Sequence, residues 1–224
     1  MPEFNLLKSV PSIRRSVAAR LVNKDVNRAE ALKFGQAYFD GPREQGYGGY
    51  TYDGRWKAVA ATARDRYGLK AGMKVLDIGC AKGFFVHDLM EMVPGLEAVG
   101  IDISAYALEH ALHSVQAHVQ QGSADKLPFA DHSFDAVFSI NTIHNLDRAG
   151  CVAALQEMVR VCKNPGACFV QVDAYRNEAE LTLFEAWMLT AQTYCTPDEW
   201  YTLFAEARYT GDYFWTILEF DETE

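Results

Sequence analysis

Long apolar runs are absent from this 224-residue sequence. No stretch approaches the roughly 20 consecutive apolar residues that a membrane-spanning helix needs. Residues 1–22 are mildly basic and amphipathic, but they lack the continuous apolar segment and the cleavage site of a secretory signal peptide. We therefore expect a cytoplasmic protein with no membrane partner.

Cysteine is scarce, and its spacing is uninformative. An odd number of cysteines without a C-x-x-C pair argues against both a disulfide framework and a zinc site. Buried free thiols in a reducing cytoplasm are the simpler interpretation. Three histidines, at positions 110, 113 and 118, do not follow the spacing of a metal-binding helix either. We expect no metal ion. The cysteines are Cys80, Cys151, Cys162, Cys168 and Cys195.

Basic charge is in deficit, because 21 Lys and Arg face 30 Asp and Glu for a formal net charge of -9. Proteins that bind phosphate backbones usually carry the opposite excess, so no nucleic-acid partner is expected. Hydrophobic residues make up 49% of the chain and charged residues 23%, which excludes a disordered or fibrous protein. The length predicts one domain with an extension.

Short apolar runs alternate with helical patterns from residue 73 onward, which is typical of βαβ units. The pattern predicts an α/β fold with a mostly parallel sheet and helices on both faces. Strands are expected at 73–78, 97–101, 118–121, 134–140 and 167–173, with a terminal strand or hairpin in 211–220. Helices are expected at 55–67, 82–92, 105–115, 148–162, 178–190 and 196–207.

Residues 1–55 differ in character and are interpreted as an N-terminal helical extension with a lid, ahead of the main domain at 56–224. The segment 38–52 is rich in glycine and tyrosine, which gives a flexible backbone carrying large amphipathic side chains. Such a segment suits a loop that covers a ligand. The alternative, a surface loop whose aromatic rings pack on the following helix, stays open.

Acidic residues follow three successive strands. Asp77 ends the first and is followed by a turn of small residues that lets a ligand approach the backbone. Ala81 and Phe84 stand where a dinucleotide fingerprint needs its second and third glycines, which argues against a pyrophosphate cradle. Asp102 ends the second strand and can accept hydrogen bonds from two ribose hydroxyls, and Asp125 follows the third. Each could instead be a structural turn or capping residue.

The segments VLDIGCAKG, VGIDIS, GSADKLPF and FDAVFSINTIHNL resemble successive motifs of the class I S-adenosylmethionine-dependent methyltransferases. The resemblance covers about residues 56–220 and is nearest to the ubiquinone/menaquinone-biosynthesis-like branch (methyltransferase domain 11). It implies a Rossmann-like, seven-stranded sheet. It also implies S-adenosyl-L-methionine as cofactor and S-adenosyl-L-homocysteine as its product.

The resemblance assigns cofactor roles to eleven positions. Small residues approach the methionine part, where Asp77 supports the amino group and the Asn141 carbonyl binds it. Asp102 holds the ribose, and the other residues contact the adenine. Alanine in the turn is tolerable if its φ is negative. The residues are Asp77, Gly79, Cys80, Ala81, Gly83, Asp102, Ile103, Ser104, Ala124, Asp125 and Asn141.

The methyl acceptor is expected beyond the fourth and fifth strands. His144 is the predicted general base, because histidine titrates near neutrality. A packed loop histidine, a solvated surface Arg176 and a core Trp56 are the alternatives for those three residues. The predicted acceptor-binding residues are Tyr47, Tyr50, Tyr52, Arg55, Trp56, Asp173, Tyr175 and Arg176.

These patterns predict methyl transfer to an oxygen or nitrogen of a small polar metabolite by in-line displacement. A non-catalytic cofactor-binding module that regulates or scaffolds a partner is the alternative. A protein or RNA methyltransferase is disfavoured by the acidic charge and the lack of an added recognition domain. Sequence leaves the oligomeric state open, and a homodimer is one possibility.

Overall fold

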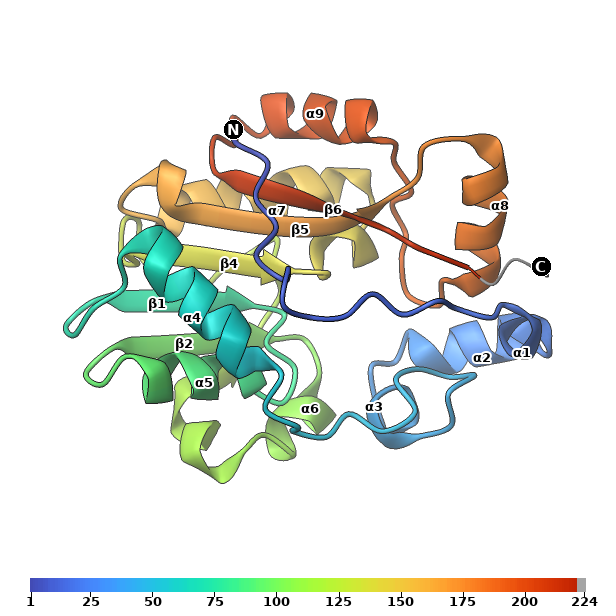
Figure 1. Ribbon diagram of the computed structural model, residues 1–224, viewed down its shortest axis with the longest axis horizontal. Helices are drawn as coiled ribbons and strands as arrows, with labels where there is room; N and C mark the ends of the chain where they lie inside the picture. Colours follow the sequence, from blue (N-terminus) through green and yellow to red (C-terminus); the bar gives the residue numbers. More distant parts are fainter. Residues whose placement is uncertain (221–224) are drawn as a thin grey trace.

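A six-stranded parallel sheet organises the chain in the computed structural model, which describes residues 1–220 (Figure 1). Within those residues the order is β3-β2-β1-β4-β5-β6 and every neighbouring pair is parallel. The expected seventh strand is not found in the described range. The strands are β1 (Lys74–Ile78), β2 (Glu97–Asp102), β3 (Val119–Gln121), β4 (Ala136–Ile140), β5 (Cys168–Ala174) and β6 (Asp212–Ile217).

Helices cover both faces of the sheet, as predicted. On one face α4 (Trp56–Tyr67) and α5 (Phe84–Met92) share a buried cluster with Val75, Phe138 and Phe169. On the other face α7 (Arg148–Val161) and α9 (Pro197–Glu206) pack on Leu76 and Val170. The β1, β4 and β5 strands are buried on both sides, which explains their nearly continuous apolar sequences.

Local signals fix several helix ends where the sequence placed them. Ser104 caps α6 (Ala105–Glu109), Thr196 and Glu199 form a capping box on α9, and Gly68 ends α4 in the left-handed conformation. The α6 helix is shorter than predicted, because the Leu112 N–H donates to the Lys82 carbonyl rather than continuing the helix. Short 3-10 turns occupy His113–His118, Ile143–Asn145 and Pro165–Ala167.

The N-terminal segment meets the last part of the chain at two points, at Tyr213 in β6 and at Phe220 beyond the end of that strand. The Phe4 N–H donates to the Tyr213 carbonyl at 2.9 Å, and the Arg15 N–H donates to the Glu219 carbonyl at 2.9 Å. The chain then forms α1 (Ala18–Leu21), α2 (Lys24–Ala31) and α3 (Gln36–Asp40). Figure 1 shows α1 and α2 below α8 (Glu178–Trp187), which follows β5.

The terminal strand pairs in parallel with β5, so the hairpin alternative is wrong for residues 211–220. Between residues 1 and 220, no helix combines the length and apolar character needed to cross a bilayer.

Candidate active site

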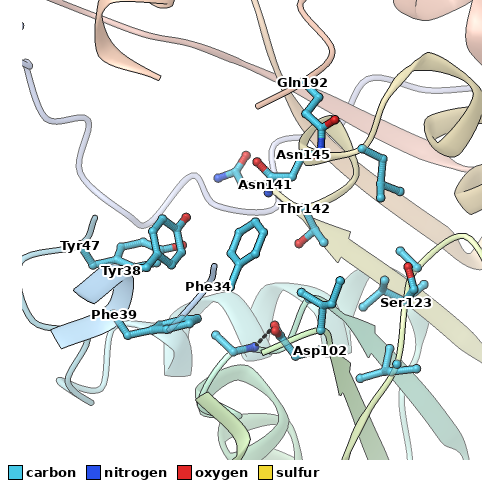
Figure 2. A pocket seen from close by; sticks show the side chains of 18 residues that line it. Phe34, Tyr38, Phe39, Tyr47, Asp102, Ser123, Asn141, Thr142, Asn145 and Gln192 are labelled. Carbon is cyan, nitrogen blue, oxygen red and sulfur yellow. Dashed lines mark hydrogen bonds between the residues drawn. The ribbon is translucent and has the colours of Figure 1, made fainter. Parts of the chain in front are cut away.

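A cavity of about 150 Å³ opens at the carboxyl ends of β1, β2 and β4. The strand order reverses between β1 and β4, and parallel sheets bind ligands at such a switch point. Figure 2 shows aromatic side chains at one end of the cavity and Ser123 at the other. Its lining residues are Phe34, Tyr38, Phe39, Tyr47, Ile78, Gly79, Ala81, Ile101, Asp102, Ile103, Gly122, Ser123, Ala124, Asn141, Thr142, Asn145, Leu146 and Gln192.

The turn after β1 forms the floor of the cavity. Gly79 has a φ of 80°, and a Cβ there would lie 2.0 Å from the Thr142 Oγ1, so no larger residue fits. Ala81 has a φ of 49°, which corrects the expectation of a negative value. Its strained backbone is held by a hydrogen bond of 2.8 Å from the Ala81 N–H to the Asp102 Oδ2 (Figure 2).

Two carboxyl groups lie at this floor. Asp102 lines the cavity and also accepts a hydrogen bond from the Ser104 N–H at 2.8 Å. Burial raises the pKa of Asp102, although hydrogen bonds from backbone N–H groups oppose the rise. Burial, followed by the negative charge of Asp102, raises the pKa of Asp77 to about 7. Asp77 is 5% exposed and lies behind the lining residues.

Six of the eleven predicted cofactor residues line the cavity, namely Gly79, Ala81, Asp102, Ile103, Ala124 and Asn141. The other five do not. Gly83 packs against Val115, a Cβ at Gly100 would strike the buried Cys80, and the Asp125 carboxylate accepts a hydrogen bond from the Ser123 hydroxyl. The Ser104 hydroxyl donates to the Phe34 carbonyl at 2.6 Å. Ser104 therefore supports the backbone of a lining residue rather than facing the cavity.

His144 is 3% exposed and is not among the lining residues. Its Nδ1 accepts a hydrogen bond from the Asp173 N–H at 3.3 Å, and its Nε2 faces the Asp173 Oδ2 at 3.5 Å. Burial lowers the pKa of the imidazole, although the Asp173 carboxylate opposes this. Since both ring nitrogens are turned to Asp173, this placement does not support the predicted role as general base. His144 joins the loop after β4 to β5.

Only one of the eight predicted acceptor residues, Tyr47, lines the cavity. Tyr50 contacts the Tyr47 ring at a centroid distance of 4.6 Å but stacks on Phe84, and Tyr52 donates its hydroxyl to Asp88. The rest are held by neighbours outside the cavity. Arg55 pairs with Asp53, Trp56 packs on Phe85, Asp173 meets His144, Tyr175 contacts Phe184, and Arg176 pairs with Glu180.

An aromatic roof replaces the predicted wall, and we define it as Phe34, Tyr38, Phe39 and Tyr47. Its rings contact one another at centroid distances of 5.1–5.9 Å. Asp40, at the end of α3, fixes the roof to the main domain through Lys82 at 2.7 Å and the Tyr106 hydroxyl at 2.8 Å. Sequence reasoning missed Phe34, which lies between α2 and α3 with a left-handed φ of 48° and therefore belongs to no helical spacing.

A polar wall of Asn141, Thr142, Asn145 and Gln192 completes the cavity (Figure 2). The Gln192 Nε2 donates to the Asn145 carbonyl at 2.7 Å. The side-chain Oδ1 of Asn145 is buried and accepts no hydrogen bond within residues 1–220. A buried acceptor of this kind costs free energy until a donor reaches it. Of these four residues, only Asn141 was predicted from the sequence.

The lining residues suit S-adenosyl-L-methionine. Asp102 offers carboxylate oxygens for two adjacent hydroxyls. Ile103 exposes 53% of its surface and provides an apolar face for an adenine ring. Small residues at Gly79 and Ala81 leave the backbone accessible to the methionine part of the cofactor. No feature of the cavity resembles a pyrophosphate cradle.

Comparison with known proteins agrees with this reading. Residues 69–208 match the family described as methyltransferase domain. Cycloartenol-C-24-methyltransferase 1 of Oryza sativa subsp. japonica is 35% identical over 111 residues, which are 46% of this chain and 30% of the rice protein. Demethylmenaquinone methyltransferase of Roseiflexus sp. is 35% identical over 116 residues, or 50% of this chain and 46% of that protein. The chain thus spans less than half the length of both relatives.

A solved structure shares the fold. The YcgJ protein from Bacillus subtilis superimposes with a TM-score of 0.53 and 25% identity, over 66% of each chain. The parallel sheet, the small-residue turn after β1 and the carboxylate after β2 fit the family match, which covers more than half of the sequence. The chain belongs to the methyltransferase-domain family of class I enzymes, which use S-adenosyl-L-methionine as cofactor.

Proposed function

We propose that the protein transfers the methyl group of S-adenosyl-L-methionine to an oxygen or nitrogen atom of a small polar metabolite. The observation that carries the proposal is Asp102, whose carboxylate lines the cavity beside the small-residue turn and between backbone donors. The names of the relatives, which refer to a sterol and a quinone as acceptors, support a small-molecule acceptor. That the chain belongs to the ubiquinone/menaquinone-biosynthesis-like branch is also part of this proposal.

The bound cofactor supplies an electrophilic methyl group on a positively charged sulfur. Asp102 would hold the ribose, with Ile103 and Ala124 beside the adenine. The aromatic roof lines one end of the cavity, and its closure over bound ligands would exclude water and strengthen each polar contact inside. Asn145 and Gln192 place an amide oxygen and amide hydrogens where an acceptor could be oriented for in-line attack.

Proton removal has few candidates in the cavity. The ionisable side chains that line it are Asp102, Tyr38 and Tyr47. Burial raises the pKa of Tyr38, and the Tyr38 hydroxyl together with burial raises that of Tyr47, so both phenols keep their protons at neutral pH. Asp102 is committed to the ribose. We therefore propose that the attacking atom arrives already unprotonated, and that positioning accounts for most of the rate.

Calorimetry with S-adenosyl-L-homocysteine tests the binding part of this proposal. Asp102→Ala should weaken binding by about tenfold or more, because charge-assisted hydrogen bonds contribute about 1.5–3 kcal/mol each. Asp65→Ala is the matched control, since Asp65 is exposed on α4 and, among residues 1–220, forms an ion pair with Arg64 alone. Equal affinity in a folded Asp102→Ala variant contradicts the assignment. Label transfer from [methyl-³H]S-adenosylmethionine to a small-metabolite extract then separates an enzyme from a non-catalytic binding module.

A further inference from the structure

Three arginines from the N-terminal extension surround a single indole ring at the end of α8. The guanidinium carbons of Arg20, Arg43 and Arg15 lie 3.8, 5.3 and 5.9 Å from the centroid of Trp187. We call these four residues the arginine cluster. Arg15 precedes α1, Arg20 lies in α1 and Arg43 follows α3, so the three arginines come together only when this segment folds onto α8. The arrangement is unusual in a chain with a net charge of -9.

The positive charge of the arginine cluster is only partly balanced nearby: Glu44 favours the charged form of Arg20, and Asp173 and Glu219 favour that of Arg15. No ion pair within residues 1–220 includes any of the three arginines. Arg20 is 7% exposed, and its Nε is buried without a hydrogen-bond partner in the same range. Burial, and then the like charge of Arg43, lowers the pKa of Arg20 to about 10. Buried charges are normally paired with an opposite charge, whereas the Arg20 Nη atoms donate to the uncharged carbonyls of Trp187 and Gly46.

Attachment of the extension does not require this crowding. Lys24 and Arg28 already fasten α2 to the end of α8 and the residues that follow it, by donating to the carbonyls of Ala186, Met188 and Ala191 at 2.5–2.8 Å. Arg43 is exposed and adds a further positive charge beside Arg20, which costs free energy if its only role is attachment. A ligand that neutralises the arginine cluster removes this cost.

The arginine cluster lies directly behind one end of the cavity. The Arg20 Nη2 donates to the Gly46 carbonyl at 2.9 Å, and the Arg43 Nη1 donates to the Tyr47 carbonyl at 2.9 Å. Tyr47 and Tyr38 form the end of the cavity opposite Ser123 (Figure 2). The Arg20 charge reaches the Tyr38 hydroxyl, where it offsets part of the rise that burial causes in the pKa of Tyr38.

We propose that the arginine cluster binds a carboxylate or phosphate group of the methyl acceptor, so that the acceptor is an anionic small molecule. This inference rests on the proposed function, which places the adenine at the Ser123 end and leaves the Tyr47 end for the acceptor. Guanidinium groups bind planar oxyanions through paired N–H donors, and the indole face holds them in position. The anionic group would sit outside the aromatic roof while the reacting atom faces Asn145 and Gln192.

Binding of two simple oxyanions tests the inference. Calorimetry in low-salt buffer with saturating S-adenosyl-L-homocysteine would measure inorganic phosphate and succinate separately, which distinguishes a phosphate site from a carboxylate site. Arg43→Gln should weaken binding of the preferred anion by about tenfold or more. Arg28→Gln is the matched control, since Arg28 fastens the extension without contacting Trp187. It should change anion affinity less than about twofold, a small effect on the free-energy scale.

The readouts separate the two proposals. Both variants should bind S-adenosyl-L-homocysteine like the wild type. A wild-type protein that binds this product but neither oxyanion contradicts the arginine-cluster inference alone, as does unchanged anion affinity in Arg43→Gln. A wild-type protein that fails to bind S-adenosyl-L-homocysteine contradicts the proposed function. Arg20→Lys checks the geometry, because it retains the charge but loses the planar pair of donors; anion binding should weaken.

Discussion

Asp77 is a buried acid with a measurable pH signature. Burial, then the charge of Asp102, raises its pKa from 3.8 to about 7. A group that holds its proton more tightly in the folded chain stabilises the fold while protonated. That contribution is complete below the unfolded value of 3.8 and is lost as the pH rises to about 7. Above that pH the free protein retains an ionised carboxylate in an apolar setting.

Asp77→Asn should therefore stabilise the cofactor-free protein more at pH 8 than at pH 5. Two pH units at about 1.36 kcal/mol each give a difference on the order of 2–3 kcal/mol. In a chain of this size each kcal/mol shifts Tm by about 2–4 °C. Thermal unfolding of the wild type and the variant at pH 5 and pH 8 measures this difference in stability. Asp65→Asn is the control, because Asp65 is exposed. A gain that is the same at both values would show that the Asp77 pKa is not raised.

Several of the predicted cofactor residues that line the cavity follow the end of a strand. Asp102 and Asn141 line the cavity because parallel strands bring their carboxyl ends to one edge. His144 also follows a strand, but the 3-10 turn at Ile143–Asn145 rotates it into the core and presents Asn145 instead. The left-handed conformation of Ala81 is equally invisible in sequence, because the Asp102 hydrogen bond that holds it is a long-range contact.

At the level of elements, the glycines of the 38–52 segment have a role that composition did not reveal. A Cβ at Gly46 would lie 1.9 Å from the Tyr38 carbonyl, and one at Gly41 would lie 2.4 Å from the Ala37 carbonyl. These two glycines permit close backbone packing within residues 37–46. The left-handed conformations occur nearby, at Gly48 and Gly49. That the segment opens and closes remains a prediction.

Asp40 is the point at which opening can be tested. Burial acts to raise the pKa of this carboxyl, but hydrogen bonds from Lys82, Tyr106 and the Tyr50 N–H outweigh it and lower the pKa. Asp40→Asn should release the aromatic roof from the main domain. Hydrogen exchange over residues 34–50 should accelerate by about tenfold, as loss of one charge-assisted bond implies. S-adenosyl-L-homocysteine should also dissociate faster.

Asp53→Asn provides the comparison for this experiment. Asp53 lies just beyond the same segment, and its carboxylate pairs with exposed Arg55. It makes no contact with the roof, so exchange over residues 34–50 should match that of the wild type. If hydrogen exchange over residues 34–50 is equally slow in the Asp40→Asn and Asp53→Asn variants, Asp40 does not hold the roof in place.

For the molecule as a whole, the main question is where the folded unit begins. Sequence composition separated residues 1–55 from the rest, and this boundary is still a prediction. The β-strand pattern predicted the α/β class and the helices on both faces, since those depend on local periodicity. It could not predict that Glu3 and Arg15 would form bridges with Tyr213 and Phe220, because such pairing depends on backbone hydrogen bonds that leave no side-chain signature.

Leu6 tests whether the N-terminal segment belongs to the main core. It is 0% exposed and joins the buried cluster formed by α4, α5 and the sheet. Leu6→Ala should destabilise the protein by about 2–5 kcal/mol, through lost burial and the cavity left behind. Leu21→Ala is the matched control, because Leu21 in the same extension is 54% exposed and should cost under about 0.5 kcal/mol. Urea unfolding measures both. One shifted, cooperative transition for Leu6→Ala would show that the first residues fold with the sheet, and an unshifted transition would place them outside the cooperative unit.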